Sequence, residues 1–234
     1  AAPAEGFSST SFVSQDLFMD DEFELDSGWI IGAIGDNATD GTWVRGDPIG
    51  TAAQPENDHT PFGTDCWFTG QGNVGGSVGS ADVDGGTTTL VSPIIDLSSG
   101  DAEISYWRWF DISEGGTPFT DTMTVEISNG GDWVTVETLG PAEGPDTVGG
   151  WVFHTFQVSD YLRPNATVSI RFRARDTLFA SVVEAALDDV VVRRLECVTC
   201  QTDLGLSGPG DLTLGLCGPV LASGMDGKLE ITNG

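Results

Sequence analysis

Hydrophobic and polar residues alternate along eight stretches of this chain, a pattern typical of half-buried β-strands. The stretches are rich in β-branched and aromatic residues, and clusters of glycine, asparagine, aspartate and serine separate them. They cover residues 28–34, 87–94, 102–112, 121–127, 133–139, 151–158, 167–174 and 185–194. Helical periodicity is nearly missing. The pattern therefore predicts an all-β fold, an antiparallel β-sandwich of the jelly-roll type.

Residues 43–86 interrupt this pattern with little hydrophobic periodicity and many acidic and amide side chains. A loop this long without regular structure is normally functional or disordered. Aromatic residues argue against disorder, because they supply buried area that disordered segments lack. They are Trp43, Phe62, Trp67 and Phe68. We therefore expect an ordered loop that a bound ion holds in place.

Clustered oxygen ligands in this loop predict a calcium site, because Ca²⁺ binds about six to eight oxygen atoms. Asp82 and Asp84 are two residues apart in an extended segment, so their carboxylates point to the same side. Glu56 and Asp58 have the same spacing. The expected ligands are Glu56, Asp58, Asp82 and Asp84, with Asp47 or Asp65 completing the set. The alternative is that these are solvated loop acids and turn-forming residues.

A second candidate calcium site joins the two ends of the expected sandwich. Glu24 near its start would share an ion with Asp188 or Asp189 in its closing strand. That ion would unite the first and last strands.

The charge balance narrows the classes of partner. Lys and Arg number 9 against 36 Asp and Glu, which gives a net charge of −27. Such a chain repels phosphate, so nucleic acid and anionic membranes are not expected partners. The same charge favours divalent cations, although a simply acidic or halophilic surface would look alike.

The cysteines and the start of the chain suggest export. An even count in a Gly-, Thr- and Ser-rich β protein favours two disulfides, in one of three pairings. The cysteines are Cys66, Cys197, Cys200 and Cys217. Cys197 and Cys200 also have the CxxC spacing of a zinc site, but no second CxxC motif supplies the remaining ligands. No apolar run approaches the ~18 residues of a membrane span, and residues 1–4 suit a mature chain after signal-peptide cleavage.

We expect three segments: an N-terminal extension at 1–16, the sandwich at 17–200, and a C-terminal linker and strand segment at 201–234. The last segment contains two isolated strand-like stretches, 211–216 and 229–232. Two short strands do not form a stable domain alone. The tail is therefore expected to pack on the sandwich, to begin a truncated domain, or to pair with another molecule.

Several motifs in order carry a family resemblance. They are DEFE and GW within 21–29, GTWVRGDP at 41–48, QPENDHT at 54–60, DVDGGTTTL at 82–90, ISYWRWF at 104–110, and the strand at 185–190. Over about residues 17–197 the chain resembles MAM-like jelly-roll modules of secreted or surface-anchored bacterial proteins, often found beside metallopeptidase domains. The resemblance implies a jelly roll, structural calcium and a non-catalytic accessory role, but no particular ligand.

Two glycine-rich strings resemble enzyme motifs. Residues 75–79 match GxSxG and residues 70–75 match GxGxxG. Both motifs require a helix directly after the turn, and no helix is predicted here. We therefore interpret them as turns and expect no enzymatic activity.

Two further patterns concern surfaces. Trp107 and Trp109 share one face of a strand, with Tyr106 and Phe110 on the other, so one aromatic pair faces the core and the other faces outward. An outward indole pair would provide a platform for sugar rings. Residues 171, 173 and 175 are arginines that form an outward stripe, which either pairs with acids on the next strand or docks to another copy.

Taken together, the sequence predicts a non-catalytic, calcium-binding extracellular β-sandwich module for binding or surface attachment. One alternative is a self-assembling extracellular filament or tube subunit that uses calcium and the tail at 201–234. Another is a carbohydrate-binding module that uses Trp107 and Trp109. Expected partners are other copies of the chain, a cell-surface protein or a glycan.

Overall fold

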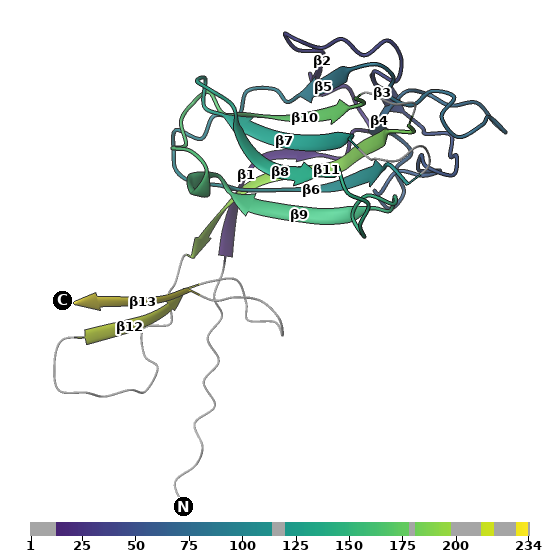
Figure 1. Cartoon of the computed structure of the whole chain (residues 1–234). Coiled ribbons are helices and arrows are strands. Elements are labelled where there is room, and N and C mark those ends of the chain that lie inside the picture. The colour runs from purple at the N-terminus through teal and green to yellow at the C-terminus, as the bar shows by residue number, and fades with distance from the viewer. Residues whose placement is uncertain (1–12, 114–119, 178–180, 198–211, 218–227, 234) are drawn as a thin grey trace, which may run out of the picture. The chain divides into compact units, whose positions relative to one another are not determined.

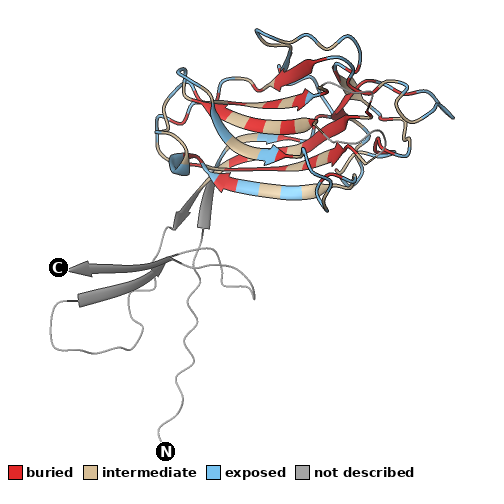
Figure 2. Ribbon diagram, in the orientation of Figure 1, coloured by how far each residue is buried: buried red, intermediate tan, exposed pale blue. Residues whose placement is uncertain are grey.

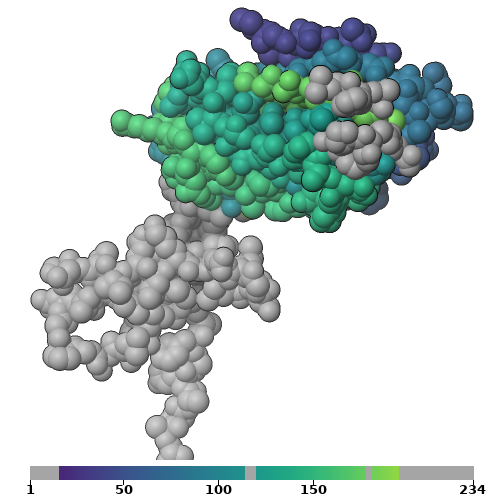
Figure 3. All heavy atoms as spheres, viewed as in Figure 1, coloured from purple at the N-terminus to yellow at the C-terminus, as the bar shows by residue number. Residues whose placement is uncertain are grey.

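The computed structural model describes residues 13–113, 120–177, 181–197, 212–217 and 228–233 (Figure 1). Figure 3 shows the heavy atoms of the chain as spheres in the same orientation. The chain divides into two compact units, one of Leu17–Arg193 and one of Ala1–Asp16 together with Arg194–Gly234. Within the described residues the only helical element is a 3₁₀ turn at Val158–Asp160. None of the described helical structure is long and apolar enough to cross a membrane.

Two antiparallel sheets form a β-sandwich, as the sequence predicted. Sheet A has the order β3-β4-β11-β6-β9, and β1 also pairs with β11. Its strands are β1 (Val13–Asp21), β3 (Trp43–Gly46), β4 (Cys66–Thr69), β6 (Glu103–Asp111), β9 (Val152–Gln157) and β11 (Glu184–Cys197). Sheet B has the order β2-β5-β10-β7-β8. Its strands are β2 (Ile30–Ile31), β5 (Thr87–Val91), β7 (Thr122–Ser128), β8 (Val134–Leu139) and β10 (Ser169–Arg175). Successive strands pass repeatedly from one sheet to the other, as in a jelly roll.

Alternation along the strands places the core between the sheets. In β10, Ile170, Phe172 and Ala174 are fully buried, while the arginines between them face outward. The same alternation buries Tyr106 and Phe110 of β6. Figure 2 shows this as red segments separated by tan and blue ones along the strands. Hydrophobic and polar residues therefore alternate in the sequence because one face of each strand packs in the core and the other faces solvent.

The expectation of one long loop at 43–86 was wrong in part, because this stretch contains β3 and β4. All four residues of β4 are buried, so the strand has no polar face and no alternation to detect. Trp43, Trp67 and Phe68 are buried as the expected order of this stretch requires, whereas Phe62 is fully exposed.

A buried polar network joins the two sheets. Arg108 of β6 donates from Nε and Nη2 to Glu137 Oε1 of β8, at 2.9 and 2.6 Å. The Tyr106 hydroxyl donates to Glu137 Oε2 at 3.1 Å, and His154 Nδ1 lies 3.3 Å from Oε1. Burial raises the pKa of Glu137, but the hydrogen bond from His154 and the contacts with Arg108 outweigh it and hold the pKa at about 2. Glu137 is therefore a carboxylate at neutral pH.

The tail contains β12 (Leu212–Cys217) and β13 (Lys228–Asn233), which pair with each other as an antiparallel two-stranded sheet. Both lie close to the stretches that the sequence predicted. What the tail contacts beyond this pairing stays a prediction.

Cys66 is a free, fully buried thiol, so the expectation that it forms a disulfide was wrong. Cys66 lies in β4, whose four residues are buried, and it packs with Phe68 and Ala186 against Val44, Trp109 and Trp151. The side chains of Cys197, Cys200 and Cys217 lie outside those described, so their pairing stays a prediction.

Candidate functional site

The segment between β3 and β4, residues 47–65, folds over the outer face of sheet A; we call it the covering loop. Two tryptophans, one in β6 and one directly before β9, hold it: Trp109 Nε1 donates to Ala53 O at 2.7 Å and Trp151 Nε1 donates to Asn57 O at 3.3 Å. Beneath it, Trp109 and Trp151 pack on the buried group of Cys66, Phe68 and Ala186. The loop thus gives sheet A a second, smaller apolar core on its outer side.

His59 fixes the loop above β6. Its ring stacks on the Trp107 indole, with 3.8 Å between ring centroids and 18° between planes. Its Nδ1 lies 2.5 Å from Asp189 Oδ2, and its backbone N–H donates to Asp188 Oδ2 at 2.7 Å. The histidine therefore orients the loop and takes up one face of Trp107.

A β-bulge in β11 positions these two aspartates. The pairing of β11 with β6 shifts register between Asp188 and Val191, and Asp189 has a φ of 48°. An extra residue at a bulge turns neighbouring side chains toward one side of the strand. Asp188 is fully buried, and its burial raises its pKa to about 7 despite hydrogen bonds from the amides of His59, Asp189 and Thr60. The two aspartates anchor the covering loop.

The part of this face that solvent reaches is an aromatic and polar strip along β6 and β9. Phe153 exposes 48% of its surface, and its ring lies 5.4 Å from that of Trp107. Along the same face of β9, Thr155 and Gln157 are also exposed. Figure 2 shows these as pale segments along β9. We call Trp107, Phe153, Thr155 and Gln157 the outer strip.

The structure resolves which aromatic pair of β6 faces outward. Trp107 and Trp109 lie on the outer face and are partly buried, whereas Tyr106 and Phe110 lie in the core. Because Trp109 donates its N–H to the covering loop, Trp107 is the indole of β6 that belongs to the outer strip. Sequence reasoning missed Phe153, Trp151 and His59. The alternation of β9 already placed Phe153 opposite Phe156, which was the available signal for an outward aromatic side chain.

Asp58 and Glu24 come together beside Gly63. A Cβ at Gly63 would lie 2.2 Å from Asp58 Oδ2 and 2.6 Å from Glu24 Oε1, so a larger residue there would displace both carboxylates. Glu24 Oε1 accepts the amides of Thr64 and Asp65. Asp58 Oδ2 is buried and has no hydrogen-bond partner among the described residues. Burial first, then the charges of Glu24, Asp189 and Asp47, raises the pKa of Asp58.

The other acids expected in the loop site have separate roles. Asp65 pairs with Arg45 at 2.6 Å, and Glu56 Oε2 accepts the Gly50 amide at 2.9 Å. The Asp47 side chain contributes charge to the surroundings of Asp58.

Asp82 and Asp84 belong to a different group from Glu56 and Asp58. Asp82 is buried, its Oδ2 accepts the Val183 amide, and burial together with Asp84 raises its pKa to about 6. The backbone of Asp84 pairs with Asp40. The charges that act on Asp82 are those of Asp84 and Asp176, whereas Glu24, Asp189 and Asp47 act on Asp58. The acids that surround Asp82 therefore differ from those that surround Asp58, and whether both pairs enclose one ion stays a prediction.

The described acidic side chains do not by themselves form a metal site. In the described part of the chain, no group of three or more His, Cys, Asp or Glu side chains is arranged to hold a metal ion. A calcium site would therefore need backbone carbonyls and water beside Asp58 and Glu24.

The two enzyme-like strings lie in turns. Residues 70–79 contain no helix, so neither a nucleophile elbow nor a phosphate-binding helix start is formed there.

Comparisons with known proteins concern the fold. No protein-family model matches the chain, and no curated protein matches it. Among solved structures, it is similar to the K1 cleaved adhesin domain of Lys-gingipain from Porphyromonas gingivalis W83, with 16% identity, a TM-score of 0.45, and coverage of 76% of this chain and 97% of that one. It is also similar to the family 11 carbohydrate-binding module from Clostridium thermocellum, with 13% identity, a TM-score of 0.43, and coverage of 78% and 96%. A third is the CBM22-1 xylan-binding domain of Paenibacillus barcinonensis Xyn10C, with 15% identity, a TM-score of 0.41, and coverage of 80% and 98%. At this level of similarity they say nothing about the ligand of this chain.

Proposed function

We propose that this chain is a non-catalytic, extracellular β-sandwich module that binds carbohydrate on the outer strip of sheet A. The observation that carries the proposal is the half-exposed Phe153 ring beside Trp107. Two neighbouring aromatic rings offer a flat apolar surface, and the apolar face of a sugar ring can stack on such a surface.

The polar neighbours of Phe153 fit the same ligand class. Thr155 and Gln157 offer hydroxyl and amide groups along the strand, which suits the hydroxyls of successive sugar units. The platform is also rigid, because His59 stacks on Trp107 and is itself held by Asp189. A rigid platform loses little conformational entropy when a ligand binds.

Phe153→Ala tests this proposal. A glycan array first identifies a bound oligosaccharide, and calorimetric titration then compares the variant with the wild type. We expect the affinity to fall by roughly tenfold or more, the loss of about 1.4 kcal/mol of stacking. Phe62→Ala is the matched control, because Phe62 is also an exposed phenylalanine but belongs to the covering loop. The proposal is wrong if no glycan binds, or if Phe153→Ala binds as tightly as the wild type.

We further propose that Ca²⁺ stabilises the covering loop next to Asp58 and Glu24. The support is the buried Asp58 Oδ2, which has no hydrogen-bond partner among the described residues, and the raised pKa of Asp58, caused by burial and then by the charges of Glu24, Asp189 and Asp47. Hard carboxylate oxygens suit calcium, and backbone carbonyls and water would complete the coordination. When bound, the ion would neutralise charge where Asp47, Glu24 and Asp189 crowd Asp58.

Thermal unfolding with calcium and with chelator tests this site. At a calcium concentration about 100-fold above Kd, binding adds about 2.7 kcal/mol, which raises Tm by about 5 to 10 °C. Asp58→Asn should abolish this increase, whereas Asp132→Asn, in the turn between β7 and β8, should keep it. An identical Tm with calcium and with chelator in the wild type would refute the calcium proposal and leave the glycan proposal standing.

As part of the same proposal, the chain is a relative of the MAM-like modules, lies outside the cell and attaches to a surface. The sequence motifs at 41–60 and 82–110 support this.

A further inference from the structure

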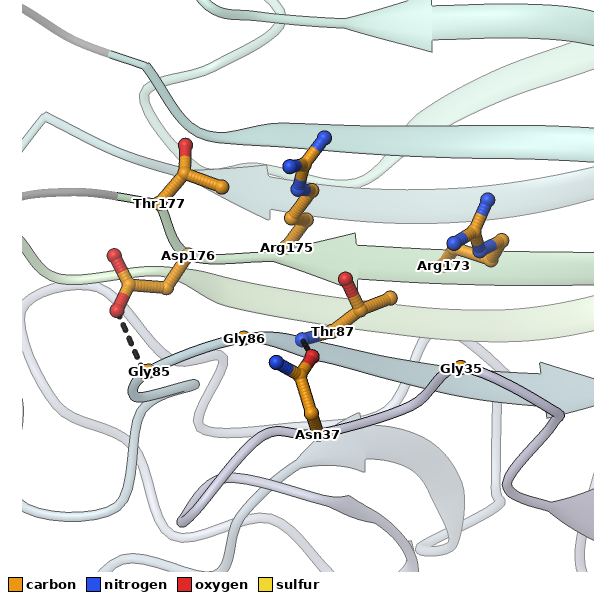
Figure 4. A pocket seen from close by; sticks show the side chains of 9 residues that line it. All are labelled: Gly35, Asn37, Gly85, Gly86, Thr87, Arg173, Arg175, Asp176 and Thr177. Carbon is orange, nitrogen blue, oxygen red and sulfur yellow. Dashed lines mark hydrogen bonds between the residues drawn. The ribbon is translucent and has the colours of Figure 1, made fainter.

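An open groove lies on the outer face of sheet B, on the opposite sheet from the outer strip. It has a volume of about 690 Å³, within the range of small-ligand sites, ~300–1,000 Å³. The 33–38 segment forms one wall and β10 the other (Figure 4). It is lined by Gly35, Asn37, Gly85, Gly86, Thr87, Arg173, Arg175, Asp176 and Thr177. We call it the arginine groove.

Two arginines give the groove positive charge in a strongly acidic chain. Arg173 and Arg175 project side by side from β10 in Figure 4. Arg173 lies 3.5 Å from Glu126, but Arg171 already binds that same carboxylate at 2.8 Å. Arg175 is exposed and forms no ion pair with any described residue. The groove therefore has one arginine that shares its carboxylate with Arg171 and one, Arg175, that has no ion-pair partner in the described part of the chain.

The remaining walls are small and polar. The Asn37 side-chain oxygen accepts the Thr87 amide at 3.1 Å, and a Cβ at Gly86 would lie 2.4 Å from that oxygen. Glycine at 86 is therefore needed to seat Asn37 against the floor. Asp176 is the acidic residue of the groove lining, and its Oδ2 accepts a hydrogen bond from the Gly85 amide at 2.7 Å. That bond draws Asp176 toward β5, as the dashed line in Figure 4 shows.

We propose that the arginine groove binds the carboxylate of a uronic-acid unit in an acidic oligosaccharide. A guanidinium binds a carboxylate through two parallel hydrogen bonds, and Arg173 and Arg175 together present two such forks. Asn37, Thr87 and the glycine backbone supply partners for sugar hydroxyls. An acidic peptide fits less well, because the groove lining contains no apolar side chain to receive one. The net charge of −27 does not forbid this, since charges beyond about 8 Å are largely screened at physiological salt.

Titration of the full chain with trigalacturonate tests the groove, with neutral galactotriose as the paired probe. We expect trigalacturonate to bind, and Arg175→Gln to weaken the binding by roughly tenfold, as loss of one charge-assisted contact does. Arg173→Gln/Arg175→Gln should remove it. Arg163→Gln is the matched control, because Arg163 is another exposed arginine without an ion pair among the described residues. Unfolding midpoints check that each variant is folded.

The groove and the outer strip are separable, so this inference does not rest on the proposed function. Phe153→Ala should leave trigalacturonate binding unchanged, and raising the salt should weaken it. The inference is overturned if trigalacturonate does not bind, if it binds equally to the double variant, or if galactotriose competes for the same site with equal affinity. A hexaglutamate peptide that binds as tightly as trigalacturonate would also overturn the saccharide assignment.

Discussion

At the scale of single residues, Glu184 is the side chain whose ionisation matters most to the sandwich. It is 2% exposed, and among the described residues Thr69 Oγ1 at 3.0 Å and Gln54 Nε2 at 3.3 Å donate to it. Burial outweighs these hydrogen bonds and, together with the charge of Asp82, raises the pKa of Glu184 to about 8. Sequence could not reveal this, because an acid at the start of a strand is ordinarily solvated and its partners Thr69 and Gln54 are distant in the chain.

Glu184→Gln should remove a pH dependence of stability. A raised pKa in the folded state means that the contribution of Glu184 is fully present below pH ~4.5 and is lost as the pH rises to about 8. The loss over that window is on the order of 5 kcal/mol. Urea midpoints measured from pH 5 to 9 should therefore fall less steeply in Glu184→Gln than in the wild type. Glu143→Gln, at an exposed glutamate, should follow the wild type; equal slopes in all three proteins would contradict the assignment.

At the scale of elements, the alternation of hydrophobic and polar residues predicted where strands lie, but it did not predict which distant segments contact each other. The strand at 167–174 was predictable because Ile170 and Phe172 alternate with arginines along it. β4 was not, because it is buried on both faces. The covering loop could not be placed either, since its anchors lie far along the chain: Asn57 meets Trp151, and His59 meets Asp188. Local patterns carry no information about such pairings.

The network between β6 and β8 is a further element-scale contact. Arg108→Met leaves the largely buried Glu137 carboxylate without its arginine partner, which costs about 3 kcal/mol and lowers Tm by roughly 10 °C. Arg193→Met removes a more exposed pair with Glu103, where we expect less than about 1 kcal/mol. Thermal unfolding of both variants provides the comparison. If Arg108→Met melted no lower than Arg193→Met, the inter-sheet network would not stabilise the sandwich.

At the scale of the whole molecule, the two sheets present chemically different outer faces. Sheet A carries the outer strip and the covering loop, and sheet B carries the arginine groove. The acidic composition argues against nucleic acid and anionic membranes as partners, and this stays a prediction; it did not indicate where the few arginines lie. That depends on which side of β10 faces outward and on the position of the 33–38 segment beside it.

The central claim is that the outer strip binds carbohydrate, and a titration of the best array glycan into wild-type protein and Phe153→Ala tests it most directly. We predict saturable binding to the wild type, a roughly tenfold or greater loss in Phe153→Ala, and unchanged binding in Phe62→Ala. Equal affinity for wild type and Phe153→Ala, with both proteins folded, would contradict the claim.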